Sequence, residues 1–366
     1  MTAKPTIICA VTNDLNQDQR MRRVCTTLQR QGYEVTLVGR SKAASEPLTS
    51  QPYQQVRLEV EPEHGPWFYF NYNQALLQYL KQQRPDIIYA VDTDTLLACT
   101  RAKKKLGCRL VLDAHEYFTE VPELTNKPVK KTIWRQVEKY CLPHTDARIT
   151  VGPALAKVLT ERDRQSYEVI RNVPEKTGKK HERGNSEKII LYQGVLNRGR
   201  GLEAAIDALP MIAEKEVELH LVGGGDLEAE LKARAANSSC AERIVFHGWL
   251  YGDQLQRQTA GAWLGLNLLD DSALNYRYSL ANKFFDYMHA AVPSLNMDLP
   301  EYQSIVAEHA VGLMCQDLSP STIANVINSI TPQQYDDMVH AAEVASPLFC
   351  WDQEQHTLIR IISELH

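Results

Sequence analysis

The stretch "YQGVLNRGRGLEAAIDAL", residues 192–209, decides the fold expected for the second half of the chain. A β-branched strand ends at Gly194, a short polar loop follows, and Gly201 opens an amphipathic helix. Glycines permit close backbone approach, and a helix N-terminus favours anions. Arg198 and Arg200 in this loop therefore suit a phosphate or diphosphate. A solvated turn with surface arginines is the alternative.

The same alternation of short strands and amphipathic helices runs through the whole chain, as is typical of parallel α/β sheets. It occupies residues 1–173, breaks at the polar linker-like stretch 174–188, and restarts over residues 189–349. We therefore expect two Rossmann-like, doubly wound domains that face a cleft, with ligands at the carboxyl ends of the strands. The last helix, 350–366, could pack on either domain.

Composition indicates an ordinary globular protein. The 366 residues are 44% hydrophobic and 23% charged, and no apolar run is long enough for a transmembrane helix. The opening "MTAKPTIICAVTND" is too short in apolar residues for a signal peptide and predicts a first strand. The eight cysteines are scattered without metal-site spacing, which favours buried free thiols and a cytoplasmic location.

Charge is distributed unevenly along the chain. Residues 1–170 contain 24 Lys and Arg against 19 Asp and Glu, and the remainder contains 16 against 26. The first half is thus basic and the second acidic, which favours two units with different partners. The basic residues form no clustered stripe with aromatics, so we do not expect a nucleic-acid partner.

Two further turns in the second half follow strands. "HLVGGGDLEAEL" places Gly223 and Gly224 between a strand and a helix, but without the full spacing of a dinucleotide-binding motif. A glycine turn that merely ends the strand is equally consistent with this pattern. "FHGWL", after the next strand, could present backbone groups to a base.

The stretch "SLANKFFDYMHAAVPSL", residues 279–295, contains one acid, Asp286, in an apolar helix. Burying an unpaired carboxylate is costly, so Asp286 needs a partner. It could be an interface acid or a partner of the helix dipole. Beside arginines and a glycine turn it would also suit a ribose diol.

The ordered set "YQGVLNRGRGLE", "LHLVGGGDLEAEL", "IVFHGW" and "NKFFDYMHAAVPSL" resembles family 4 of the glycosyltransferases. The first-half stretches "TNDLNQDQRMRRVCTTLQRQGYEVTLVGR" and "LVLDAHEYFTEVPEL" are similar to the same family. This resemblance implies the GT-B fold and transfer of a sugar from a nucleotide-sugar donor with retention of configuration. It also implies no metal, no cofactor, and a last helix that returns to the N-terminal domain.

The resemblance also implies roles for individual residues. Arg200 would neutralise the donor diphosphate with help from Arg198, and Asp286 would accept hydrogen bonds from the ribose. His115 would face the transferred sugar. The remaining donor-side residues would be Asn13, Asp14, Gly223, Gly224, Tyr278, Asn282 and Lys283, and Glu116, Asp92 and Asp94 would lie on the acceptor side.

Three positions depart from the family pattern. Tyr278 stands where the family has the first of two paired acids, Asp286 is shortened from glutamate, and Val195 replaces a basic residue. Tyr278 keeps open the alternative of a non-catalytic nucleotide-sugar-binding protein. A nucleotide-sugar epimerase on the same fold is a further alternative.

"VDTDTLL" contains an Asp-x-Asp pair, Asp92 and Asp94, which in another glycosyltransferase fold would bind a divalent metal. We expect no metal here, because no third ligand is evident. Asp94 is instead expected to cap the helix over residues 94–106.

Two stretches suggest the acceptor. "NKPVKKTIWRQVEKYCL" predicts a basic amphipathic helix, and "GPWFYFNYNQ" clusters aromatic residues. Both would suit contact with an anionic membrane. The acceptor would be a glycan or a lipid-linked molecule, and a lipid-linked acceptor would place the protein at the inner membrane face. A solvated charged helix face over an ordinary core is the alternative.

Overall fold

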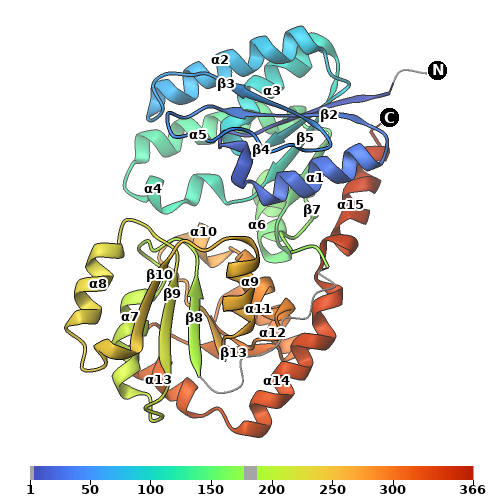
Figure 1. The fold of residues 1–366 in the computed structure, drawn as a ribbon. Helices are drawn as coiled ribbons and strands as arrows, with labels where there is room; N and C mark the ends of the chain where they lie inside the picture. The colour runs from blue at the N-terminus through green and yellow to red at the C-terminus, as the bar shows by residue number, and fades with distance from the viewer. Residues whose placement is uncertain (1–3, 177–187, 366) are drawn as a thin grey trace. The chain divides into compact units, whose positions relative to one another are not determined.

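The computed structural model describes residues 4–176 and 188–365. The chain divides into two compact units, one of Met1–Arg171 with Gln353–His366 and the other of Asn172–Asp352. Each unit is a parallel sheet flanked by helices (Figure 1), which confirms the predicted α/β class of two Rossmann-like units. Most of the expected linker, residues 177–187, lies outside the described residues, and the cleft between the halves stays a prediction.

Unit 1 contains a seven-stranded sheet in the order β3-β2-β1-β4-β5-β6-β7, and every neighbouring pair is parallel. The order reverses between β1 and β4, which is where a doubly wound sheet offers its ligand crevice. The strands are β1 Thr6–Ala10, β2 Glu34–Arg40, β3 Gln54–Leu58, β4 Ile87–Val91, β5 Arg109–Ala114, β6 Ala147–Thr150 and β7 Glu168–Val169.

Helices cover both faces of this sheet. α2, α3 and α5 pack against one another, and the hydroxyl of Thr27 on α1 lies 3.4 Å from the amide oxygen of Gln355 on α15. The helices of unit 1 are α1 Gln19–Arg30, α2 Pro66–Gln83, α3 Asp92–Leu106, α4 Pro122–Thr125, α5 Pro128–Cys141, α6 Pro153–Asp163 and, from Gln353 on, α15 Trp351–Ser363.

Unit 2 contains a six-stranded parallel sheet in the order β10-β9-β8-β11-β12-β13, which reverses between β8 and β11. The carboxyl ends of β8, β9 and β10 therefore adjoin, and the loops that follow them meet. The strands are β8 Ile189–Gln193, β9 Glu218–Val222, β10 Ile244–Gly248, β11 Leu264–Asn267, β12 Ser294–Met297 and β13 Gly312–Cys315.

The helices of unit 2 also form two groups. α7 contacts both α8 and α13, and on the other side α11 contacts α9 and α14, and α14 also contacts α12. Phe284, Phe285 and Met288 of α11 belong to the main hydrophobic core, which leaves its polar residues at the edge of that core. The bounds are α7 Leu202–Ala208, α8 Glu228–Ala236, α9 Gly252–Ala260, α10 Leu274–Arg277, α11 Asn282–His289, α12 Pro300–His309, α13 Pro320–Asn328 and α14 Pro332–Ala345.

Two elements of unit 1 differ from the sequence pattern. β3 was not predicted, because its residues are polar or only half-buried and show no apolar run. α2 begins at Pro66, so the aromatic cluster forms the first turns of this helix. Proline at the first helical position favours this start.

Candidate functional site

Two glycine turns meet at the carboxyl ends of β8 and β9. Gly194 has a φ of 134° and Gly223 a φ of 131°, a conformation that residues with side chains rarely adopt. A Cβ atom on Gly223 would lie 1.8 Å from the carbonyl oxygen of Gly194. Glycine is therefore required at 223, because the backbone of the neighbouring turn fills the space that a Cβ atom would need.

Arg200 lies in the loop between β8 and α7. Its Nε atom is buried without a hydrogen-bond partner, and its guanidinium carbon lies 5.2 Å from the centre of the Tyr276 ring. Within the part of the chain that the structure describes, Arg200 forms no ion pair. A buried donor without a partner is costly, so this guanidinium has hydrogen-bonding capacity that a ligand could use.

Lys283 is the second residue of α11. Its Nζ atom lies 3.7 Å from the centre of the Tyr192 ring and 3.9 Å from where a Cβ atom on Gly194 would be. Burial lowers the pKa of Lys283 well below its usual value, and the charge of Arg200 lowers it further. Among the described residues Lys283 also forms no ion pair. Two neighbouring basic groups that form no ion pair are a candidate site for an anion.

Asp286 lies one turn further along α11 than Lys283. The side-chain amide of Gln193, at the end of β8, donates to its Oδ2 atom over 3.1 Å. The Oε1 atom of Gln193 in turn accepts from the hydroxyl of Thr259 on α9. These contacts bring the half-buried Asp286 to the end of β8, beside the glycine turns.

Three other predicted donor-side residues are exposed or only half-buried. Arg198 is 77% exposed and pairs with Glu230 over 3.1 Å on the surface, so its side chain is already committed to an acid. Asn282 is exposed at the start of α11. Tyr278 is half-buried just after α10, where its backbone N–H donates to Leu274.

In unit 1, a buried charge network forms at the carboxyl end of β5. Asp113 receives two hydrogen bonds from the guanidinium of Arg20 on α1, at 2.8 and 3.0 Å, and one from the Tyr89 hydroxyl at 2.8 Å. Burial would raise the pKa of Asp113, but Arg20 and His115 hold it well below its usual range. The carboxylate is therefore charged and fully compensated.

His115 is held by two acids. Its Nε2 atom lies 3.0 Å from Asp113 Oδ2, its backbone N–H donates to Asp92 Oδ1 over 2.8 Å, and its Nδ1 atom is 3.9 Å from Asp92 Oδ2. Burial opposes a charged imidazole, but Asp113 and Asp92 together raise the pKa of His115 above its usual value. The Nδ1 side of the ring lies beyond hydrogen-bond distance of Asp92.

Asp92 and Asp94 stand at the start of α3, near this histidine. Asp92 has a φ of 54°, and α3 begins at this residue. The expectation that Asp94 caps the helix is therefore wrong, since Asp94 lies inside the first turn and accepts from the Thr12 hydroxyl over 2.6 Å. Burial raises the pKa of Asp92 to about 7 and that of Asp94 to about 6, and the charge of Glu116 adds to both shifts.

No metal site accompanies these acids. Among the described residues, no group of three His, Cys, Asp or Glu side chains could hold a metal ion. Glu116 itself is exposed.

The loop after β1 has a local role. Asp14 accepts from the backbone of Asn16, from Ser45 and from Arg57, and Asn13 donates to Asp18 over 2.8 Å. Burial opposes ionisation of Asp14, but its hydrogen bonds to Ser45, Asn16 and Arg57 lower its pKa. Both predicted donor-binding residues of this loop are therefore engaged in holding the loop itself.

Sequence reasoning missed Arg20, Tyr89 and Asp113. Asp113 lies two residues before His115, and residues two apart in a strand share one face of the sheet. That alternation was the available signal for Asp113. Nothing local in the sequence indicates that Arg20, on a helix 93 positions earlier, is its partner.

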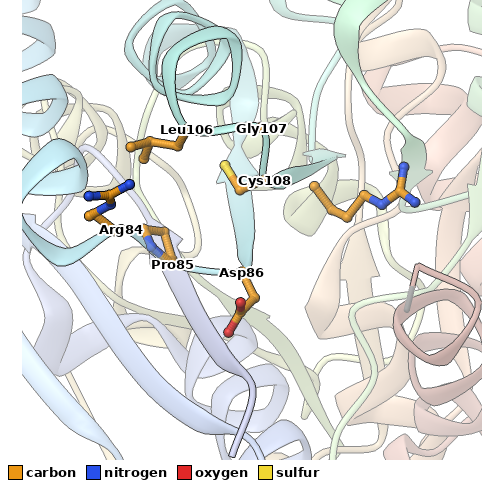
Figure 2. Close-up of a pocket in the computed structure, with 7 residues that line it drawn as sticks. Arg84, Pro85, Asp86, Leu106, Gly107 and Cys108 are labelled. Atoms are coloured by element: carbon orange, nitrogen blue, oxygen red, sulfur yellow. The ribbon is translucent and has the colours of Figure 1, made fainter. Parts of the chain in front are cut away.

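A cavity of about 370 Å³ lies elsewhere in unit 1 (Figure 2). Its lining comes from the turns that enter β4 and β5, at the opposite edge of the sheet from His115: Arg84, Pro85, Asp86, Leu106, Gly107, Cys108 and Arg109. It lies at the amino ends of the strands, whereas ligands of doubly wound sheets bind at the carboxyl ends. The cavity is therefore not the candidate site.

Comparisons with known proteins agree with this architecture. The family described as "Glycosyl transferase 4-like domain" matches residues 17–172, and "Glycosyl transferases group 1" matches residues 187–331. The search of curated proteins finds no match.

Solved structures show the same fold at low identity. Sucrose-phosphate synthase from Thermosynechococcus elongatus is 17% identical with a TM-score of 0.81, over 99% of both chains. HepE from Anabaena, solved in complex with UDP-glucose, is 14% identical with a TM-score of 0.78, over 98% of this chain and 99% of its own. The lipopolysaccharide glycosyltransferase WaaG is 13% identical with a TM-score of 0.74, over 97% and 99%. With both units matched by glycosyltransferase families and with the GT-B fold in common, the chain belongs to the group 1, family 4-like glycosyltransferases.

Proposed function

We propose that this protein is a retaining glycosyltransferase that moves a hexose from a nucleotide-diphosphate-sugar to a glycan or lipid-linked acceptor. The observation that carries the proposal is the pair Arg200 and Lys283, basic groups that form no ion pair among the described residues and lie beside a glycine turn. A diphosphate would supply the missing negative charge. The complex of the related HepE with UDP-glucose supports a donor of this class.

The chemistry follows from where charge develops. The bond between the sugar's anomeric carbon and the diphosphate oxygen breaks, and its electron pair leaves with the diphosphate. Arg200 and Lys283 would stabilise that departing charge, which is the largest single contribution in many enzymes. The acceptor hydroxyl bonds to the anomeric carbon from the same face and gives its proton to the leaving phosphate.

The remaining residues would position the donor. Asp286 would accept hydrogen bonds from the ribose hydroxyls. His115 would orient the transferred sugar through its Nδ1 side and would not act as a nucleophile, because its Nε2 atom is engaged with Asp113. Glu116, Asp92 and Asp94 would lie on the acceptor side.

A panel of nucleotide sugars tests this proposal. Thermal shift and turnover are measured together, with and without lipid-linked and glycan acceptors. We expect at least one nucleotide sugar to stabilise the protein and to lose its sugar, with the anomeric configuration retained in the product. Inversion would exclude the front-face mechanism, and the absence of any stabilising nucleotide sugar would exclude the donor class.

The same panel addresses the second candidate, a non-catalytic nucleotide-sugar-binding protein. Tyr278 favours this candidate, because a tyrosine stands here in place of an acid with which the family that the chain resembles binds the donor sugar. Stabilisation without turnover would support this candidate. Conversion of the sugar to its epimer without transfer would instead support a nucleotide-sugar epimerase.

We also propose that the reaction needs no metal and no cofactor. The acids nearest His115 are used otherwise, since Asp92 binds the backbone of His115 and Asp94 binds Thr12. Full turnover in excess chelator is expected, and loss of turnover that Mg²⁺ or Mn²⁺ restores would contradict it.

We propose peripheral contact of unit 1 with anionic membrane. Tyr69 of α2 and Trp134 of α5 pack edge to face at 5.1 Å, so the two helices lie together. Around this contact several apolar and basic side chains are exposed, a combination that suits an interfacial surface: Trp67, Phe70, Lys127, Val129, Lys130 and Ile133. No helix in the described ranges is long and apolar enough to cross a membrane.

Sedimentation with liposomes tests the membrane contact. We expect the wild-type protein to sediment with anionic vesicles at low salt, and Ile133→Glu combined with Lys130→Glu to reduce it. Arg135→Glu is the control and should reduce sedimentation less, because Arg135 is already paired with Glu120. Failure of the wild-type protein to sediment would exclude this contact.

A further inference from the structure

Two exposed aromatic side chains follow β10, at the same sheet edge as Arg200 and Lys283. Trp249 is 51% exposed and Tyr251 is 62% exposed. Their rings are nearly parallel, with an interplanar angle of 11° and centres 6.2 Å apart. A pair of large exposed rings at the carboxyl end of a strand is placed where ligands of doubly wound sheets bind.

Trp249 packs directly on the second glycine turn. A Cβ atom on Gly224 would lie 2.8 Å from its indole Nε1 atom, so a side chain at 224 would displace the ring. The backbone N–H of Gly223 donates to the carbonyl of Gly248 over 2.7 Å, which ties this turn to the end of β10. The indole therefore lies against this backbone, and about half of its surface stays exposed (51%).

The contacts form one continuous path. Lys283 lies beside Gly194, Gly194 contacts Gly223, and the next residue, Gly224, contacts the Trp249 indole. Gly223 and Gly224 are buried and Gly194 is half-buried, so these contacts join Trp249 to Lys283 through packed backbone at one end of the sheet. The indole therefore belongs to the same cluster of loops as the basic groups that would meet a ligand's phosphates.

We propose that the open face of the Trp249 indole is the stacking surface for the base of a nucleoside diphosphate. This rests on the proposed function, and it assigns a residue to base binding. Base–aromatic stacking tolerates different bases, because every base has a flat π face. The Tyr251 ring stacks on Trp249, nearly parallel to it.

Calorimetric titration of UDP, ADP, GDP and inorganic pyrophosphate tests this assignment. We expect Trp249→Leu to weaken the affinity for the tightest-binding nucleoside diphosphate by roughly 10- to 100-fold, the range that loss of stacking on one base gives. Its affinity for pyrophosphate should stay within about twofold of wild type, because pyrophosphate has no base. Trp249→Phe keeps a flat ring and should retain most of the affinity.

Trp67→Leu is the matched control, since it removes another exposed tryptophan in unit 1 and should change neither affinity. An unchanged nucleoside diphosphate affinity in Trp249→Leu would overturn the stacking assignment alone. Equal loss for pyrophosphate would also overturn it, because the effect would then not concern a base. If neither pyrophosphate nor any nucleoside diphosphate binds the wild-type protein, the diphosphate site of the proposed function fails, and the stacking assignment fails with it.

Discussion

The two units treat buried charge in opposite ways. In unit 1, Arg20 and Asp113 form a bidentate pair, and each is at most 3% exposed. In unit 2, Arg200 and Lys283 lie close together, and in the described part of the chain neither meets an acid. A compensated pair can hold a structure, whereas half-buried basic groups that form no ion pair keep the capacity to bind an anion. We therefore propose Arg200 and Lys283 as ligand-binding residues, and Arg20 and Asp113 as positioning residues.

The largest effect is expected from breaking the compensated pair. Asp113→Ala leaves Arg20 buried without its carboxylate and should lower the free energy of unfolding by about 3 to 5 kcal/mol. Urea unfolding measures this loss. Asp271→Ala is the matched control, because its exposed pair with Arg277 should contribute about 1 kcal/mol or less. A loss below about 1 kcal/mol for Asp113→Ala would contradict the comparison.

The next largest effect is expected on activity, with little change in stability. Arg200→Ala should lower kcat by about 10² to 10³, as removal of one stabilising donor does, and should leave the urea midpoint nearly unchanged. Arg198→Ala lies two residues away on the same loop and removes a guanidinium already paired with Glu230, so its kcat should stay near wild type. Equal losses in both variants would show that the loop responds to charge alone.

A smaller effect depends on pH. The folded-state pKa of Asp92, about 7, lies above its ordinary value of 3.8, so the folded protein holds a proton that the unfolded chain has released. The stability that protonated Asp92 contributes is therefore fully present below about pH 4 and is lost as the pH rises from there through 7. Asp92→Asn should add about 1 to 3 kcal/mol at pH 8 and nothing at pH 4. Parallel stability curves for variant and wild type would show that Asp92 is not responsible.

The smallest effect sharpens the contrast from the other side. Lys283→Met removes an enclosed amine without an acid and should raise the free energy of unfolding by about 1 kcal/mol or less, while donor affinity falls. Urea unfolding and donor titration measure the two changes. Destabilisation by several kcal/mol would mean that Lys283 holds the structure.

The fold class could be predicted because the alternation of strand and helix patterns is local in the sequence. Alternating strands and helices sufficed for the α/β class, and β3 was missed because its polar, half-buried residues lack an apolar run. The neighbours Arg200 and Lys283 could be proposed from sequence, because both stand where strands end or helices begin.

The rest of the candidate site depends on distant contacts. Arg20 meets Asp113 across 93 positions, and no local signal connects them. The helix expected to start at Asp94 starts at Asp92 instead, where the backbone adopts a positive φ that the residue type does not reveal. Asp14 was expected at the donor, but its side chain binds Ser45 and Arg57, which lie in a loop and a strand far along the chain.

The most direct measurement is the affinity of inorganic pyrophosphate for the wild-type protein and for the double variant Arg200→Ala, Lys283→Met. We predict that the wild-type protein binds pyrophosphate, that a nucleoside diphosphate competes with it, and that the double variant binds at least about 100-fold more weakly. Equal binding by both proteins would contradict the claim that these two basic groups are kept for a diphosphate.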